Sequence, residues 1–199
     1  MELVPFISIK NKKLYRDDRK QITLDEIVER LTHDQKLYVL DRDGIERDKP
    51  NLSLYPNVSN HLPVWVDAGP RVLGDVVDIV MAGASMITIR RNRWSELDVS
   101  SVREVTENEI YADVALQRHE KRSIGFSFFQ GVDGLVLFDA RNQIERDFIA
   151  RDVVKQLCAK YALFAHEADA KNVSYWKHLG AKGLIVNLGK IQEFKTHEF

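Results

Sequence analysis

Short apolar runs recur along the chain, and most of them are followed directly by polar or charged residues. Three of these runs lie close together at Leu37–Leu40, Val64–Val66 and Met86–Ile89, with helical segments between them. Runs this short, rich in β-branched residues and joined by long connections, are typical of buried parallel strands. The same pattern predicts five more strands, at Leu3–Ile9, Glu109–Leu116, Leu135–Phe138, Tyr161–Ala165 and Gly183–Val186.

Apolar residues at helical spacing fill the segments between the predicted strands. Thr23 and Glu26 have the spacing of a capping box, which predicts a helix with Ile27, Val28 and Leu31 facing inward. A second helix is predicted to bury Val72, Val76, Val77, Ile79 and Val80, and glycines end this helix and a later one. Further helical segments are predicted after residue 50 and over 94–106, 117–131, 144–160 and 171–179.

Eight strands that alternate with helices predict a barrel, because an all-parallel set of eight strands closes without leaving an edge. Two stretches of the first half also resemble stretches of the second half in the same order. DRDGIERD at 41–48 resembles DARNQIERD at 139–147, and MAGASMITIR at 81–90 resembles HLGAKGLIVN at 178–187. We therefore predict an α/β fold, a minimal (β/α)8 TIM barrel in one domain over 1–199, built from two half-barrel repeats at roughly 1–106 and 107–199.

Composition narrows the classes of function. The chain has 199 residues, 44% of them hydrophobic, which is enough for one well-buried domain. Its net charge of −1 comes from charges of both signs mixed along the chain, so we expect no nucleic-acid partner. No apolar run approaches the about 20 residues that span a bilayer, and the start of the chain lacks the pattern of a signal peptide. We expect a cytoplasmic protein without a membrane contact, alone or as a homo-oligomer.

The one cysteine and the three tryptophans of the chain are expected to have packing roles. Cys158 is the one cysteine, which excludes an intrachain disulfide and fits a reducing compartment. Its place in a helical pattern predicts a core residue. Trp65, Trp94 and Trp176 lie near the ends of predicted elements, and we expect all three to pack against the barrel.

Polar residues gather at the carboxyl ends of the predicted strands, where barrel enzymes place their chemistry. Charges in such a position can also pair with one another without function, for instance Asp41 or Asp67 with Arg90. The sequence therefore predicts either an active site or a mouth closed by its own ion pairs. The set comprises Ser8, Lys10, Asp41, Asp43, Asp67, Arg90, Asp113, Asp139, Arg141, His166, Glu167 and Asn187.

Within this set we expect Asp113 to act as an acid or base. Asp41 or Asp67 would be its partner, since two nearby carboxylates can divide the roles of acid and base at neutral pH. His166 is a further candidate acid or base. Arg90 is expected to hold an anionic group of the ligand by bidentate contact.

The other expected substrate contacts are Ser8, Lys10, Asp43, Gly69, Asp139, Arg141 and Asn187. Lys10 could form a Schiff base, but no apolar setting in the sequence indicates an activated amine. A metal site could be argued from the carboxylates and the histidine, namely Asp41, Asp43, Asp67, His166 and Glu167. No spacing motif supports it, so we expect neither a metal nor a cofactor.

Three segments together resemble one enzyme family. LVPFISIKNKKLYR, LYVLDRDGIERDKPNLSL and VWVDAGPRVLGDVVDIVMAGASMITI resemble the first four strand-helix units of the histidine-biosynthesis isomerase HisA and its relative HisF. In that family the first strand reads P-A-I-D-L-K-x-G-K, the second carries D-L-D-G, and the fourth unit follows an A-G-A helix end. The resemblance covers Leu3 to Ile89 clearly and continues in register to Asn187, and it implies a duplicated half-barrel.

The resemblance also implies functional positions. The family isomerase uses one Asp on strand one and one on strand five as an acid/base pair on an aminoaldose phosphate. Here Asp113 holds the strand-five position and Ser8 the strand-one position, and a serine is no base unless something deprotonates it. The family binds two phosphates at glycine-rich turns, of which Gly69 is retained, whereas Glu167 would repel a phosphate. We predict that the family's bis-phosphorylated substrate is not turned over.

Three functions follow as hypotheses. The first is an isomerase or lyase that transfers protons on a small phosphorylated or carboxylated metabolite, in the biosynthesis of one-carbon carriers such as methanofuran or tetrahydromethanopterin rather than of histidine. The second is a non-catalytic barrel that binds a ligand or supports another biosynthetic enzyme. The third is a true histidine-pathway isomerase with rearranged residues.

Overall fold

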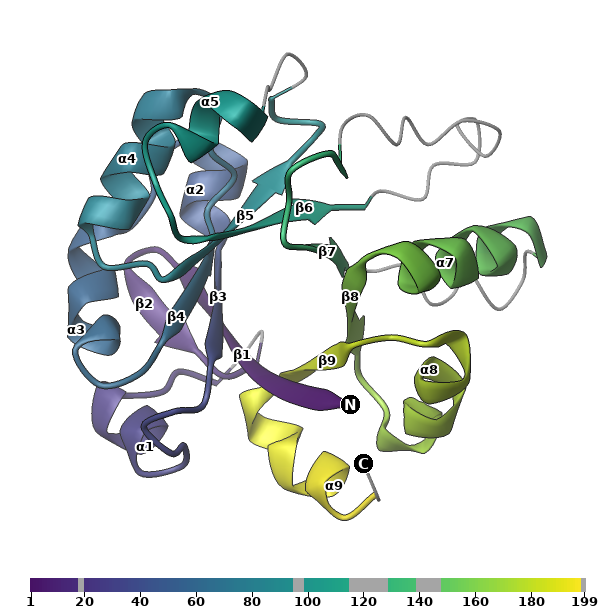
Figure 1. Cartoon of the computed structure of the whole chain (residues 1–199). Coiled ribbons are helices and arrows are strands. Elements are labelled where there is room, and N and C mark those ends of the chain that lie inside the picture. Colours follow the sequence, from purple (N-terminus) through teal and green to yellow (C-terminus); the bar gives the residue numbers. More distant parts are fainter. Residues whose placement is uncertain (18–19, 95–98, 115–128, 139–147, 198–199) are drawn as a thin grey trace.

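Eight parallel strands close into a barrel in the computed structural model, which describes residues 1–17, 20–94, 99–114, 129–138 and 148–197. Each strand pairs with the next along the chain, and the last pairs with the first. The predicted TIM barrel is thereby confirmed (Figure 1). The barrel strands are β1 (Glu2–Lys10), β3 (Leu37–Asp41), β4 (Val64–Asp67), β5 (Met86–Arg90), β6 (Glu109–Asp113), β7 (Gly134–Leu137), β8 (Ala162–Glu167) and β9 (Gly183–Asn187).

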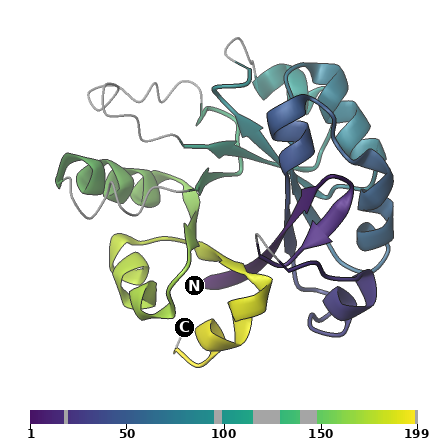
Figure 2. The ribbon, with the colours of Figure 1, turned by 180° about the vertical axis from the view of Figure 1, so that it is seen from behind.

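The described helices lie around the outside of this ring of strands, as the view from behind also shows (Figure 2). Most of them are short, which fits a barrel of minimal length. They are α1 (Leu24–Val28), α2 (Arg42–Arg47), α3 (Tyr55–Ser59), α4 (Leu73–Met81), α5 (Val99–Arg103), α7 (Phe148–Lys160), α8 (Val173–Leu179) and α9 (Ile191–Lys195), with 3-10 turns η1 (Leu52–Leu54), η3 (Ala170–Asn172) and η4 (Leu188–Lys190).

Local signals placed two helix ends correctly. Thr23 is the N-cap of α1, and its side chain and that of Glu26 form the predicted capping box. Gly180 ends α8 in the left-handed conformation, with φ 88°. The predicted helix over 117–131 lies mostly outside the described residues, as do 95–98 and 144–147 of two other predicted helices.

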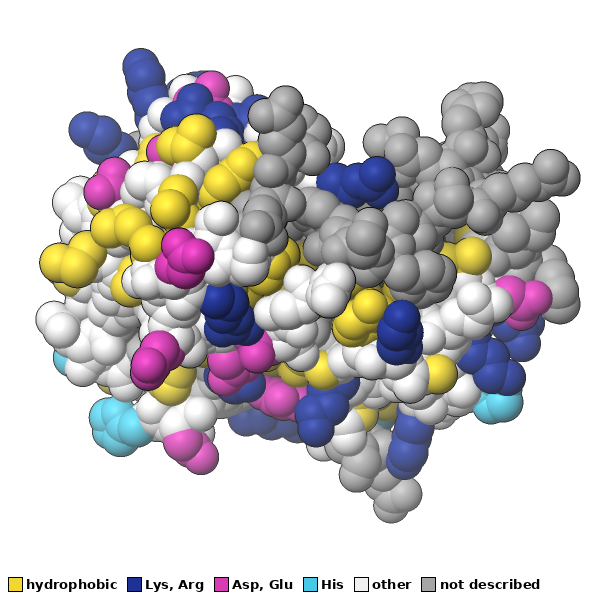
Figure 3. Space-filling model, turned by 45° about the horizontal axis from the view of Figure 1, so that its top comes forward, with side chains coloured by type: hydrophobic (Ala, Val, Ile, Leu, Met, Phe, Trp, Pro, Cys, Tyr) yellow, Lys and Arg dark blue, Asp and Glu magenta, His cyan; other side chains and the backbone are white. Residues whose placement is uncertain are grey.

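The inward face predicted for α4 is partly wrong. Val76 and Ile79 are buried, but Val72 and Val77 are exposed by 55% and 37%. The helix packs on the barrel by one stripe only, so the valines beside that stripe face solvent. Hydrophobic side chains gather on the left of the face in Figure 3, on the side that carries α4 and α5 in Figure 1.

A short hairpin, which the sequence pattern did not predict, follows the first strand. β2 (Lys13–Tyr15) pairs with β1 in the antiparallel sense, outside the barrel. Asn11 and Lys12 make its turn with φ of 51° and 59°, and the Lys12 backbone N–H donates to Asp43 at 3.2 Å. Two left-handed residues in succession are the geometry of a tight hairpin turn, which the polar composition of this segment did not reveal.

Alternation along the strands divides the core in two. Residues facing outward pack against the helices, whereas those facing inward fill the barrel. The Trp65 ring lies 3.8 Å from that of Tyr111 and 5.1 Å from that of Phe164, between ring centroids. The interior is therefore packed rather than open. Its buried members are Val4, Tyr38, Leu40, Trp65, Met86, Tyr111, Val136, Phe164 and Ile185.

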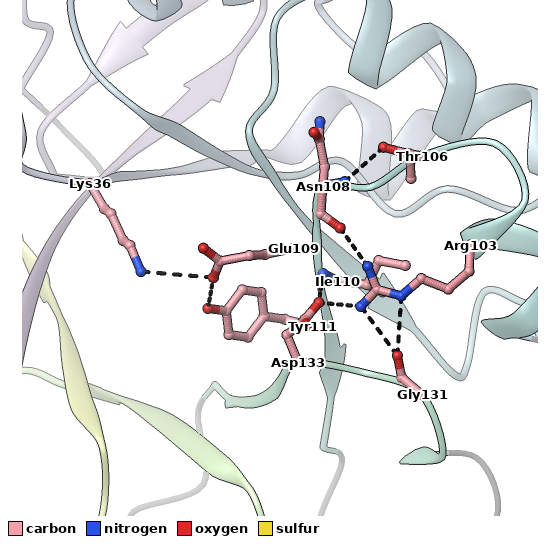
Figure 4. A network of polar contacts seen from close by, with 9 residues as sticks. All are labelled: Lys36, Arg103, Thr106, Asn108, Glu109, Ile110, Tyr111, Gly131 and Asp133. Carbon is pink, nitrogen blue, oxygen red and sulfur yellow. Dashed lines mark hydrogen bonds and ion pairs between the residues drawn. The ribbon is translucent and has the colours of Figure 1, made fainter.

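Polar contacts join the amino ends of the strands at the floor of the barrel (Figure 4). Glu109 accepts a hydrogen bond from the Tyr111 hydroxyl and lies 3.8 Å from the Lys36 amine. Beside it, Arg103 of α5 contacts Asp133 and the Gly131 carbonyl. The Arg103 contacts hold α5 to the segment before β7, at the end opposite the predicted site, so we assign them to stability.

Candidate functional site

A cavity of about 780 Å³ opens at the carboxyl ends of the strands. This volume is within the range of pockets that hold small molecules. Its wall combines apolar side chains with both signs of charge. The described residues that line it are Phe6, Ser8, Arg16, Asp17, Leu40, Arg42, Ile45, Glu46, Arg90, Asn92, Asp113, Val114, Phe138, His166, Ala168, Asn187, Gly189 and Lys190.

Five of the predicted site residues meet at this cavity, namely Ser8, Arg90, Asp113, His166 and Asn187. All five stand on the inward face of their strands, as the strand pairing requires. Lys10, Asp41, Asp43, Asp67 and Gly69 are not among the described residues of its wall, and Asp139 and Arg141 lie outside the described part of the chain.

Asp67 lies beneath Arg90 rather than in the cavity. Its two oxygens accept from Arg90 Nε at 2.8 Å and Nη2 at 2.6 Å, and the Tyr38 hydroxyl donates at 2.6 Å. The carboxylate is fully buried, so solvent and ligand do not reach it. Burial works against the charge of Arg90, but Asp67 and Asp113 raise the pKa of this guanidinium above its ordinary value. Arg90 and Asp67 therefore form a bidentate ion pair beneath the mouth.

Asp113 is the one of the three predicted carboxylates Asp41, Asp67 and Asp113 that lines the cavity. It is buried to 9% relative exposure, lines the cavity, and places Oδ2 3.6 Å from Arg90 Nη1. That distance is an ion pair without a short hydrogen bond. Asp113 therefore combines contact with the cavity and an ion pair with a neighbouring cation.

Asp41 faces outward, away from the cavity. It is fully buried and accepts from the Gly44 backbone at 3.1 Å, from the Asn51 backbone at 2.6 Å and amide at 2.8 Å, and from the Tyr55 hydroxyl at 2.5 Å. These bonds cap α2 and fix the segment that follows it. Asp41 is thus engaged in loop structure, so neither of the two partners expected for Asp113, Asp41 or Asp67, is among the described residues of the cavity wall.

Asp43 is likewise engaged in structure. It accepts from the Lys12 backbone at 3.2 Å and from the Asn51 amide at 3.1 Å. Burial opposes its charge, but the Asn51 amide and backbone N–H groups outweigh that effect and hold the pKa of Asp43 below its ordinary value. The side chain ties the β1–β2 turn to the loop after β3.

Glu167 repeats this outward arrangement at the end of β8. It accepts from the backbones of Ala168 and Asp169, from the Asn172 amide at 3.2 Å, and from the Trp176 indole N–H at 2.8 Å. The side chain is buried at 3% exposure beside α8. The expected repulsion of a phosphate by Glu167 therefore does not arise inside the cavity.

An aromatic wall was not predicted from the sequence. The rings of Phe138 and His166 stack with centroids 4.3 Å apart and an angle of 6°, and Phe6 meets both edge-on. The stack fixes the plane of the imidazole. The signal that could have found Phe6 is its position two residues before Ser8, because alternate residues of one strand share a face.

Further cations at the rim were also missed. Arg16, Arg42 and Lys190 line the cavity from the segments that follow β2, β3 and β9. Lys190 Nζ donates to the Ala168 carbonyl at 2.9 Å, which joins the loops after β8 and β9. Together with Arg90 they give the described wall four cations against three carboxylates, Asp17, Glu46 and Asp113. This small excess of positive charge is consistent with an anionic ligand.

No group of three or more His, Cys, Asp or Glu side chains that could hold a metal was found within the described residues. The candidate ligands diverge, because Asp41 accepts from Tyr55 and Glu167 from Trp176, both in the core outside the strands, while His166 lines the cavity. None of the helices in the described part of the chain is both long and apolar enough to cross a bilayer.

Comparison with known proteins supports the fold. No protein-family model matches the chain, and no curated protein matches it. Among solved structures the chain is similar to 3-hexulose-6-phosphate synthase from Salmonella typhimurium, with a TM-score of 0.65 and 14% identity over the whole of both chains. At an identity this low, the structural similarity shows a shared barrel fold and nothing about activity.

Proposed function

We propose that the barrel mouth is the active site of an isomerase or lyase that transfers protons on a small anionic metabolite. The observation that carries the proposal is one cavity of about 780 Å³ lined by a partly buried cation, a carboxylate and an imidazole, namely Arg90, Asp113 and His166. The structural neighbour is named for a phosphorylated sugar, which supports a phosphorylated ligand over a neutral one.

Each of the three groups has a role in this proposal. Arg90 holds the phosphate or carboxylate of the ligand, since its guanidinium suits a bidentate oxyanion. Asp113, 3.6 Å from Arg90 Nη1, removes or returns a proton next to that group. His166, fixed by the Phe138 stack, is the second proton donor or acceptor. Ser8 and Asn187 supply polar contacts to the ligand.

Deuterium exchange tests proton transfer before the reaction is known. A set of phosphorylated and carboxylated metabolites is screened by thermal shift, and each binder is incubated with the protein in deuterated water and followed by NMR. We expect deuterium to enter the ligand with the unmodified protein, and exchange to fall at least about 100-fold in Asp113→Asn while binding is retained.

Glu109→Gln is the matched control, because Glu109 begins the strand that Asp113 ends and lies at the floor. Exchange should continue in this variant. If Asp113→Asn exchanges a bound ligand as fast as the unmodified protein does, the catalytic assignment is wrong.

A non-catalytic barrel is the second candidate. The observation that favours it is that Arg90 is already paired with carboxylates on two sides, Asp67 and Asp113. This alternative predicts a ligand or partner enzyme that binds at the mouth without exchange of any carbon-bound proton.

The relation to HisA remains part of the proposal. Asp113 stands at the acid/base position of strand five that the resemblance implies, while Ser8 stands where the family has its second carboxylate. We propose a divergent relative that acts in one-carbon-carrier biosynthesis in the cytoplasm. Failure to rescue a strain that lacks the histidine isomerase is expected, and rescue would restore the histidine pathway as the function.

Self-association is also proposed. The exposed hydrophobic residues on and beside α4, among them Met81 at 81% exposure, support a homo-oligomer. Light scattering after size exclusion should give a mass above 23.0 kDa, and a monomeric mass at micromolar concentration would contradict it.

A further inference from the structure

A continuous line of polar contacts runs through the barrel interior to the guanidinium at the mouth. The Trp65 indole N–H donates to Thr88 Oγ1 at 2.9 Å, and the Tyr38 hydroxyl lies 3.5 Å from the same oxygen. Tyr38 donates to Asp67 at 2.6 Å, and Asp67 accepts from Arg90 along one edge of the guanidinium. The line crosses three neighbouring strands, β3, β4 and β5.

Of the residues in this line, only Arg90 at its end lines the cavity. Tyr38, Trp65, Asp67 and Thr88 have no exposed surface, whereas the Arg90 side chain is 15% exposed and lines the cavity. Burial, and then the Asp67 charge, raise the pKa of Tyr38 well above its ordinary value, so the phenol remains a donor. The Tyr38 hydroxyl and the Asp67 carboxylate therefore act on a ligand through Arg90. The Tyr38 ring also stacks on Phe138 of the cavity wall at 6.0 Å, a contact that Tyr38→Phe retains.

The geometry of the guanidinium explains how Tyr38 and Asp67 affect ligand binding by Arg90. Its Nε and Nη2 atoms are committed to Asp67, and the group is planar, so fixing this edge also fixes the direction of the edge that carries Nη1. Nη1 lies on the side of Asp113, toward the cavity. A long flexible side chain is thereby held in one orientation before any ligand arrives, which reduces the entropy lost on binding.

We propose that Tyr38 and Asp67 are positioning residues that preset Arg90 as a receptor for one oxyanion of the ligand, a phosphate or a carboxylate. The inference rests on the proposed function, because it assumes that Arg90 meets the ligand. It goes beyond that function by assigning a task to two buried residues that never touch the substrate.

Tyr38→Phe tests the proposal, since it removes only the hydroxyl. Tyr55→Phe is the matched control, because Tyr55 also donates from a buried phenol to a buried carboxylate, Asp41, but on the outer side of the strands. A purely structural role predicts the same behaviour for both variants, namely lower stability and unchanged anion binding.

The first measurement needs no ligand. The exchange of the Arg90 Nε–H with water is followed by ¹⁵N NMR, with Arg90→Lys to assign the signal. In the unmodified protein this N–H is held by a buried carboxylate, so slow exchange is expected. We expect Tyr38→Phe to speed it by about tenfold, as one hydrogen bond to a charged group is lost, and Tyr55→Phe to leave it within twofold.

The second measurement uses inorganic phosphate and, separately, acetate as probes in calorimetric titrations. We expect the dissociation constant for the preferred probe to rise about tenfold in Tyr38→Phe and in Asp67→Asn, and to stay within twofold in Tyr55→Phe. Phosphate binding without acetate binding would identify the ligand group as phosphate, and the reverse as carboxylate; either supports the proposal.

The two kinds of failure are distinct. If Arg90→Lys binds the probes as the unmodified protein does, the anion-binding part of the proposed function is wrong, and with it this inference. If Arg90→Lys weakens binding but Tyr38→Phe changes neither the exchange rate nor the affinity, the proposed function stands and the positioning role is refuted.

Discussion

Asp41 provides the sharpest test of the distinction between structural and functional carboxylates at the strand ends. The perturbation is Asp41→Asn, which keeps the shape of the side chain and removes its charge. Gly44 and Asn51 donate to one oxygen, and Asn51 and Tyr55 donate to the other. Whichever oxygen becomes an amide, two donors lose their acceptor, and at least one of them is a backbone N–H.

The magnitude follows from these contacts. Hydrogen bonds to a charged group each contribute about 1.5–3 kcal/mol, and the loss of two in a fully buried site should lower the free energy of unfolding by roughly 3–5 kcal/mol. A domain of this kind has a total of about 5–15 kcal/mol, so the variant should be markedly less stable but still folded at low temperature. Anion binding at the mouth should be unchanged, because Asp41 is not in the cavity wall.

Urea unfolding followed by circular dichroism measures the effect, and phosphate titration of the folded variant measures binding. Asp78→Asn on the exposed side of α4 is the control and should change stability by less than about 0.5 kcal/mol. A loss below about 1 kcal/mol in Asp41→Asn would refute the reasoning from the hydrogen bonds. Weaker phosphate binding in a folded variant would restore Asp41 to the site.

Three further outcomes are expected. Gly134→Ala should lower the free energy of unfolding by about 1–3 kcal/mol, because the new Cβ would lie 2.5 Å from the Ala162 carbonyl oxygen. In Gly74→Ala the new Cβ meets nothing within 4 Å, so the free energy of unfolding should stay unchanged or rise. Equal shifts of the melting temperature in the two variants would contradict this. Burial raises the pKa of the Cys158 thiol to about 11, so alkylation by iodoacetamide should be slow at pH 8 and rise through pH 11; labelling at the rate of a free thiol would contradict the burial. The lowered pKa of Asp43 stabilises the fold above the unfolded pKa of about 4, and this stability is lost as the pH falls through the folded value. The difference in free energy of unfolding between the unmodified protein and Asp43→Asn should therefore shrink from pH 6 to pH 2. A constant difference would contradict this.

Strand and helix positions were predictable because they depend on short-range patterns. Each predicted strand corresponds to a barrel strand, since buried parallel strands are continuous apolar runs whatever their neighbours are. The capping box at Thr23 is also local, since both of its bonds close within four residues. Cys158 shows the limit of such patterns, because it was expected in the core and is only half-buried.

The site was predictable as a region but not as a set of residues. The sequence placed acids at the ends of the second and third barrel strands, and these look equivalent when read along the chain. In the structure Leu40 pairs with Asp67, so these two share the inner face, and Asp41, one residue further, faces outward. A shift of one residue thus separates a carboxylate that orients Arg90 from one that caps a helix.

The sequence by itself therefore determined the alternation of strands and helices, the closed barrel and the end at which polar residues collect. Only the tertiary structure decided which polar side chains enter the cavity, that Asp67 pairs with Arg90, and that Phe138 stacks on His166. The physical reason is that side chains alternate with a period of two along a strand, whereas the stagger between strands is set by closure of the whole barrel. No short segment of the sequence determines that stagger.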